Sequence, residues 1–178
     1  MTGHPTLDAT LALVATAHAS QVDKAGAPYV DHPRRVMARL LLRWPDAPAE
    51  ELHAALLHDV IEDTPITAEQ LRAQGYSDRV LAILQLVTRG DETYEAFVER
   101  VATSGDIGAI RVKLSDLADN LDPVRVAALP ANGRGRGQRY EAAASRLGLA
   151  LAAPKLERLA TMERCSTTIR PPRAPSIS

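Results

Sequence analysis

Apolar residues recur at intervals of three and four along most of this chain, the spacing that places side chains on one face of an α-helix. An early segment carries Leu7, Leu11 and Val14, and a later one carries Leu114 and Leu117. Convincing alternation of the kind typical of a half-buried strand does not occur. We therefore predict helices over residues 7–19, 33–44, 46–64, 67–75, 77–87, 93–101, 106–121 and 138–163, the last interrupted at Pro154.

Residues that favour helix N-caps stand at the start of several of these segments. They are Asp46, Thr67, Ser77, Thr93 and Asp106, and Gln70 completes a capping box with Thr67. Gly75 is a typical stop for the short helix before it. The pattern predicts one all-α domain of about eight helices over residues 1–164. Residues 165–178 are rich in proline and poor in apolar residues, so we expect a disordered tail.

Composition narrows the class of protein. The chain is 46% apolar and 24% charged, with a net charge of -1, which argues against a basic nucleic-acid-binding surface. Its one cysteine, Cys165, cannot form an intramolecular disulfide. The first thirteen residues lack the features of a signal peptide, and no apolar run approaches the roughly 20 residues that cross a bilayer. We expect a cytoplasmic protein without membrane or nucleic-acid partners, and leave monomer and homodimer open.

The segment 54–64 concentrates charge beside apolar residues. It runs from Ala54 through the pair His58-Asp59 to Glu62 and Asp63. In one continuous helix His58 would lie above Glu62, and Asp59 above Asp63. Burying such charges is unfavourable unless they are paired or bind a metal, so the segment predicts a cation site.

Two other segments offer suitable ligands. His32 stands at a helix entrance, and Asp116 shares a helix face with Asn120. His32, His58, Asp59 and Asp116 together make a nitrogen and oxygen donor set without thiolate, which suits Mn²⁺ or Fe²⁺ better than a structural zinc site. We expect Lys113 to project away from Asp116.

The remaining polar candidates have simpler interpretations. His18 is more typical of a structural residue than of a ligand. His4 and His53 are expected at the surface, and Arg134 and Arg136 on a solvated loop.

Four segments, in this order, resemble the HD-domain metal-dependent phosphohydrolases, and more narrowly the RelA/SpoT-type alarmone hydrolases and their small single-domain relatives. They cover most of residues 8–125. The matching segments are Ala17-His18-Ala19-Ser20-Gln21, Gly26-Ala27-Pro28-Tyr29-Val30-Asp31-His32-Pro33, Ala55-Leu56-Leu57-His58-Asp59-Val60-Ile61-Glu62-Asp63-Thr64 and Val112-Lys113-Leu114-Ser115-Asp116.

The resemblance implies an HD-type helical bundle and removal of pyrophosphate from the 3′ position of (p)ppGpp. It implies Mn²⁺ at His32, His58, Asp59 and Asp116, with Fe²⁺, Co²⁺ and Zn²⁺ as alternatives. Glu62 and Asp63 would position and deprotonate the attacking water. The substrate-binding residues we predict are Lys24, Tyr29, Lys113, Asn120 and Tyr140.

This chain departs from the resembled enzymes at three positions near the expected substrate. Asp23 stands where an arginine packs on the guanine, and Leu117 and Asp119 replace an arginine and a histidine. Two alternatives therefore stay open. One is hydrolysis of another nucleotide such as NADPH, and the other is a nucleotide-binding regulatory module with weak catalysis.

Overall fold

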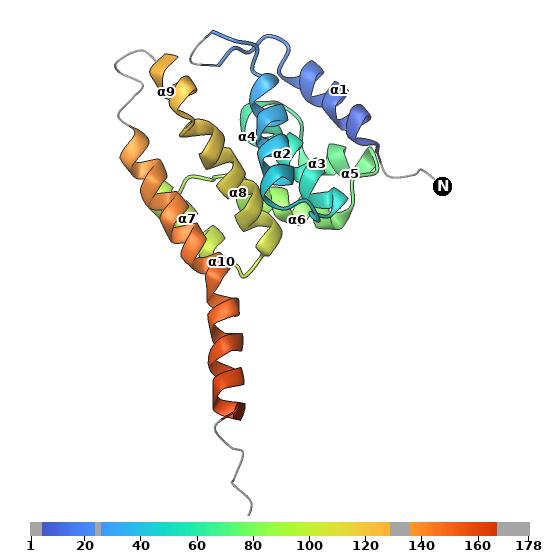
Figure 1. Ribbon diagram of the computed structural model, residues 1–178. Helices are drawn as coiled ribbons and strands as arrows, with labels where there is room; N and C mark the ends of the chain where they lie inside the picture. Colours follow the sequence, from blue (N-terminus) through green and yellow to red (C-terminus); the bar gives the residue numbers. More distant parts are fainter. Residues whose placement is uncertain (1–4, 24–25, 129–135, 167–178) are drawn as a thin grey trace, which may run out of the picture.

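Helix α3 (Ala49–Leu57) is buried along most of its length among four other helices, and α8 (Ile107–Asn120) separates it from the last helix of the chain (Figure 1). The computed structural model describes residues 5–23, 26–128 and 136–166, the side chains of residues 153–166 excepted. In chain order the other helices are α1 (Leu7–Ala17), α2 (Asp31–Arg43), α4 (Val60–Asp63), α5 (Ala68–Ala73), α6 (Asp78–Val87), α7 (Tyr94–Thr103), α8 (Ile107–Asn120), α9 (Pro123–Ala128) and α10 (Gly137–Ser166). The predicted all-α class is confirmed.

The core forms where α3 meets α1, α2, α6 and α8. Leu56 and Leu57 of α3 are almost fully buried, as are Leu40 of α2 and Leu84 of α6. Each such side chain stabilises the fold by roughly 1.5–3 kcal/mol. Because α2, α3 and α8 share this core, the polar residues near their ends are held in fixed relative positions.

Most predicted caps are present. The side chains of Thr67, Ser77, Thr93 and Asp106 each accept a backbone N–H of the following helix, and Thr67 and Gln70 form the full capping box. After α5 the chain reverses at Gly75, whose φ of 94° favours glycine.

The prediction that Asp46 caps the third helix is wrong. α3 begins at Ala49, and its N-cap is Pro48 with φ -60° and ψ 154°. Proline needs no hydrogen-bond partner for a backbone N–H, so it suits the start of a helix.

The predicted helix over residues 46–64 breaks at His58 and Asp59. α3 ends at Leu57, and Asp59, with φ -100° and ψ -5°, is the N-cap of α4. Nδ1 of His58 lies 2.9 Å from the carbonyl of Ala55, where it competes with the backbone N–H that a continuing helix would supply. The predicted continuous helix is therefore wrong, and the break lets the adjacent residues His58 and Asp59 face one site. The predicted placement of Asp59 one turn from Asp63 is retained, because the backbone N–H of Asp63 donates to the carbonyl of Asp59 at 2.8 Å.

The last helix differs from the prediction at its middle. α10 continues without interruption through Pro154 to Ser166, and its C-terminal half extends away from the bundle (Figure 1). The predicted tail lies mostly at residues 167–178, outside the described part of the chain. Among the residues that are described, no helix is both long and apolar enough to cross a membrane.

Candidate metal centre and active site

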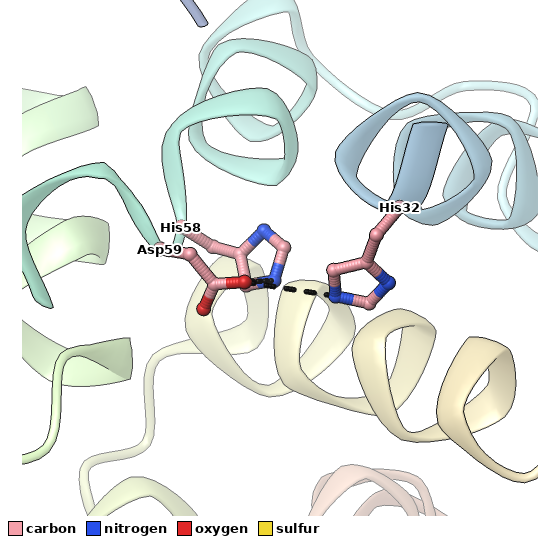
Figure 2. A group of neighbouring side chains, drawn as sticks. All are labelled: His32, His58 and Asp59. Carbon is pink, nitrogen blue, oxygen red and sulfur yellow. Dashed lines mark ion pairs between the residues drawn. The ribbon is translucent and has the colours of Figure 1, made fainter. Parts of the chain in front are cut away.

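Two buried imidazoles and two carboxylates converge where α2, α8 and the α3–α4 break meet. Nε2 of His58 lies 3.0 Å from Oδ2 of Asp59 and 3.8 Å from Oδ1 of Asp116. Nε2 of His32 lies 3.6 Å and 3.3 Å from the same two oxygens. Figure 2 shows His58 and Asp59 side by side at the α3–α4 break, with His32 facing them from α2. The structure thus brings together all four residues predicted as ligands.

Each imidazole is held from behind through Nδ1. Nδ1 of His58 lies 2.9 Å from the carbonyl oxygen of Ala55, and Nδ1 of His32 lies 2.8 Å from Oδ2 of Asp119. Both of these partners are acceptors, so each Nδ1 donates a proton to its partner, and a neutral ring presents the lone pair of Nε2 to the cluster. Nη1 of Arg125 lies 3.2 Å from Nδ1 of His32 but donates to the same Oδ2 of Asp119. This is the arrangement that metal-binding histidines adopt.

The cluster attracts positive charge. Burial lowers the pKa of His32, but hydrogen bonds to Asp116 and Asp119 outweigh it and raise the pKa to about 9. Burial likewise lowers the pKa of His58, but the charge and hydrogen bond of Asp59 and the charge of Asp116 together raise the pKa above its ordinary value. Burial raises the pKa values of Asp59 and Asp116, but their positive neighbours bring both below the ordinary value.

A divalent cation fits this cluster. The buried Nε2 of His58 has no hydrogen-bond partner among the described residues, although a carboxylate oxygen lies 3.0 Å away. A lone pair and a carboxylate repel each other unless a proton or cation lies between them. One ligand atom each from His32, His58 and Asp59 can be chosen within 4.8 Å of one another. Imidazole with carboxylate suits Mn²⁺, Fe²⁺, Co²⁺ or Zn²⁺.

Asp116 is held by neighbours on its own helix. Nδ2 of Asn120 donates to its Oδ1 at 2.6 Å, as the shared helix face predicts. Nζ of Lys113 donates to its Oδ2 at 2.7 Å. The prediction that Lys113 projects away from Asp116 is therefore wrong, because residues three apart are also neighbours on a helix.

Glu62 and Asp63 lie beside the cluster on α4. The hydroxyl of Tyr29 donates to Asp59 at 2.5 Å and to Asp63 at 3.3 Å, so one phenol contacts both carboxylates. Glu62 accepts the backbone N–H of Arg89 at 3.1 Å. Partial burial and the charge of Asp59 raise the pKa of Asp63 above its ordinary value.

A pocket of about 480 Å³ opens over these residues. Its lining combines the acidic cluster with cations and aromatic rings from α7, α8, α10 and the segments beside them. Its lining comprises Val22, Asp23, Tyr29, His32, Asp59, Glu62, Asp63, Arg89, Tyr94, Phe97, Lys113, Asp116, Asn120, Arg125, Arg136, Arg139 and Tyr140. A polyanion could therefore place one end at the acidic cluster with its metal and another among the cations.

The predicted substrate-binding residues fall mainly at this pocket. Tyr29, Lys113, Asn120 and Tyr140 line it. Lys24 lies outside the described residues.

Several other predictions change. Arg136 lines the pocket, although it was expected on a solvated loop. His53 is buried, and its Nδ1 lies 2.8 Å from the hydroxyl oxygen of Thr10, so its predicted surface position is wrong. His18 is buried, and its Nδ1 lies 2.7 Å from Oε1 of Gln21, in keeping with a structural role.

Sequence reasoning missed Asp119 as a partner of His32, and Arg89 and Arg139 as pocket residues. The sequence did carry a signal for Asp119. His32, Arg35 and Arg39 follow one another at helical spacing, and one helix face with three such donors indicates an acidic partner on another helix. Arg89 and Arg139 had none, because the α6–α7 connection and α10, which are distant in the sequence, bring them to the pocket.

Comparison with known proteins identifies relatives of this arrangement. Residues 10–139 match the model of the HD domain family. The chain is 36% identical over 115 residues to a guanosine-3′,5′-bis(diphosphate) 3′-pyrophosphohydrolase of Haemophilus influenzae, and 34% identical over 113 residues to one of Aquifex aeolicus. These alignments cover 59% and 58% of this chain, and 16% of each relative. The chain thus matches a small part of these longer proteins.

A solved structure extends the likeness to most of the fold. It is described as "A metazoan ortholog of SpoT hydrolyzes ppGpp and plays a role in starvation responses". The superposition has a TM-score of 0.68 with 26% sequence identity, and covers 88% of this chain and 98% of the other. The described helices are therefore arranged as in that protein.

Proposed function

The chain belongs to the HD domain family, and from that membership we propose that it is a divalent-metal-dependent phosphohydrolase that removes pyrophosphate from the 3′ position of (p)ppGpp. The observation that carries the proposal is the convergence of His32, His58, Asp59 and Asp116 at a pocket whose lining also includes several cations. The named activities of the Haemophilus, Aquifex and metazoan relatives support the choice of substrate.

The metal would be held by Nε2 of His32 and His58 and by the carboxylates of Asp59 and Asp116. Mn²⁺ is the ion we propose, with Fe²⁺, Co²⁺ and Zn²⁺ as alternatives. When bound, a divalent ion lowers the pKa of a water ligand and offsets charge on a phosphoryl oxygen.

Glu62 and Asp63 are the residues that we assign to the attacking water. Both line the pocket beside Asp59, and an ionised carboxylate there can accept the proton that the water loses. The backbone N–H of Arg89 fixes Glu62, and the hydroxyl of Tyr29 orients Asp63. The two acids are thus held where a proton acceptor is needed.

The cationic residues of the pocket would bind the phosphates. Arg89, Arg136 and Arg139 line it together with Lys113. Phosphoryl transfer depends mainly on positioning and on stabilising negative charge, both of which these side chains provide. Tyr140, whose ring centroid lies 5.8 Å from that of Tyr94, offers an aromatic surface for a base or ribose.

The proposal is tested with the purified chain, Mn²⁺ and ppGpp, by measuring pyrophosphate release. We expect release that stops when EDTA removes the metal. His58→Ala should abolish it, because the imidazole is a proposed ligand. Release no faster than that of His58→Ala would contradict the proposal.

A second substrate class is favoured by Asp23. Oδ2 of Asp23 lies 3.3 Å from Nη2 of Arg125 in the pocket wall, so an acid and its arginine partner occupy the place expected for a guanine-stacking arginine. The same assay with other nucleotides, NADPH among them, separates the candidates. Clear preference for a non-guanine substrate would keep the hydrolase and replace ppGpp.

A nucleotide-binding module without useful turnover is the remaining alternative. The presence of both Glu62 and Asp63 argues against it, since binding alone requires no proton acceptor. Nucleotide binding measured by calorimetry, together with an absence of turnover for every nucleotide tested, would favour this alternative.

A further inference from the structure

Asp119 is a buried carboxylate surrounded by positive groups. Its side chain has an exposed fraction of 0%, and Nδ1 of His32 lies 2.8 Å from its Oδ2. Nε of Arg35 and Nε of Arg39 donate to Oδ1 at 2.9 Å and 3.1 Å, and Nη1 of Arg125 donates to Oδ2. A buried carboxylate is unfavourable without such partners, so the surrounding arginines stabilise its ionised form.

The spacing on α2 explains how these partners meet one side chain. His32, Arg35 and Arg39 are three and four residues apart, so they share the face of α2 that packs on α8. Arg125 approaches from α9 on another side. The carboxylate is therefore fixed in position by donors from two further helices.

An ionised Asp119 determines which nitrogen of His32 carries the proton. A carboxylate accepts hydrogen bonds and cannot donate them, so Nδ1 must be the donor in the contact at 2.8 Å. Nη1 of Arg125 also lies 3.2 Å from this nitrogen, but its shorter contact is the hydrogen bond that it donates to Oδ2 of Asp119. The lone pair of a neutral His32 is then on Nε2, which points toward Asp116 and Asp59 at 3.3 Å and 3.6 Å. His58 is held differently, by the backbone carbonyl of Ala55.

We propose that Asp119 is a positioning residue of the metal centre, which orients His32 and keeps its proton on Nδ1, while the surrounding arginines hold the carboxylate in place. The inference rests on the proposed metal site and does not depend on the identity of the nucleotide. A carboxylate behind a histidine ligand strengthens metal binding, and changing such a partner typically lowers affinity by about 10–100-fold.

The test measures Mn²⁺ affinity by calorimetry on metal-free protein, using two variants. Asp119→Asn keeps the shape of the side chain and removes its charge. Asp119→Glu keeps the charge and displaces the carboxylate by one methylene. We expect both to weaken Mn²⁺ binding by about tenfold or more, because position and charge both matter.

Asp122→Asn is the matched control. Arg39 contacts both carboxylates: its Nε donates to Asp119, and its Nη2 donates to Oδ2 of Asp122 at 2.6 Å. The other oxygen of Asp122, Oδ1, accepts backbone N–H groups at the start of α9. Asparagine retains that capping ability, so Mn²⁺ affinity should stay within twofold of the wild type.

Urea unfolding checks that each variant is folded. Wild-type affinity in folded Asp119→Asn would overturn the proposal. So would wild-type affinity in Asp119→Glu alone, since charge without position would then suffice. The readout is independent of turnover. A wild-type chain that binds Mn²⁺ without hydrolysing ppGpp contradicts the proposed substrate, and the variants still decide the role of Asp119.

A spectroscopic measurement gives a second readout. In protein loaded with diamagnetic Zn²⁺, the ¹⁵N shifts of His32 report which ring nitrogen carries the proton. We expect Nδ1 to be protonated in the wild type, and a purely structural Asp119 would leave the His32 shifts unchanged in Asp119→Asn.

Discussion

The hydroxyl of Tyr29 donates to Oδ2 of Asp59 at 2.5 Å and lies 3.3 Å from Oδ2 of Asp63. One phenol thereby connects a proposed metal ligand with an acid assigned to the water. Burial and the charge of Asp59 hold the pKa of Tyr29 far above its ordinary value, so the hydroxyl remains a donor at neutral pH.

Replacing Tyr29 with phenylalanine should slow hydrolysis by about tenfold, because a hydrogen bond to a charged group contributes about 1.5–3 kcal/mol. Steady-state kcat with Mn²⁺ and ppGpp measures the effect. Tyr76→Phe is the control, since Tyr76 donates to Thr10 away from the pocket. Equal kcat values for the two variants would remove Tyr29 from the reaction.

Glu62→Gln should lower kcat by about 10²–10⁴-fold, the usual contribution of a positioned proton acceptor. Mn²⁺ affinity should be retained, because Glu62 is outside the proposed ligand set. Glu69→Gln, on the exposed surface of α5, should behave as wild type. Hydrolysis that survives the Glu62 substitution unchanged would assign the proton transfer elsewhere.

Lys113→Met should destabilise the metal-free protein by about 3–5 kcal/mol, because it leaves the buried Asp116 without its cation. Saturating Mn²⁺ should reduce this loss, since the ion supplies positive charge to the same carboxylate. Urea unfolding with and without Mn²⁺ measures both effects. Arg146→Met, which breaks the exposed pair with Glu99, should change stability by less than about 1 kcal/mol and show no response to the metal. A loss in Lys113→Met that Mn²⁺ does not reduce would place the ion elsewhere.

The pair between Arg79 and Asp106 predicts a loss of stability in acid. A hydrogen bond from Arg79 at 2.5 Å holds the pKa of Asp106 below its ordinary value. The ionised Asp106 therefore contributes its full stabilisation of the fold above about pH 4, the pKa of an aspartate in the unfolded chain. This stabilisation is lost as the pH falls through the lower pKa of Asp106 in the folded protein. Asp106→Asn retains the helix cap, so its free energy of unfolding should fall less between pH 6 and pH 3. The difference should be about 1 kcal/mol, because Arg79 is partly exposed. Parallel pH curves would contradict this.

Local sequence was sufficient for the fold class and for most helix starts, because periodicity and capping act within a few residues. Thr67 with Gln70, Ser77, Thr93 and Asp106 all cap the helices they were expected to cap. The break after Leu57 could not be read in this way, since it depends on where the side chain of His58 finds a hydrogen bond.

The four predicted ligands could be named from the sequence because their residue types and order match a known pattern. Their convergence and the burial of Asp119 behind His32 were decided only by the packing of α2, α3 and α8. The cationic lining of the pocket likewise depends on Arg89 and Arg139, which come from segments distant in the sequence. The bond between Lys113 and Asp116 lies within α8 and follows from their spacing of three residues. Chemistry that neighbouring residues determine can be inferred from the chain itself, whereas chemistry shared between helices requires their distances and orientations.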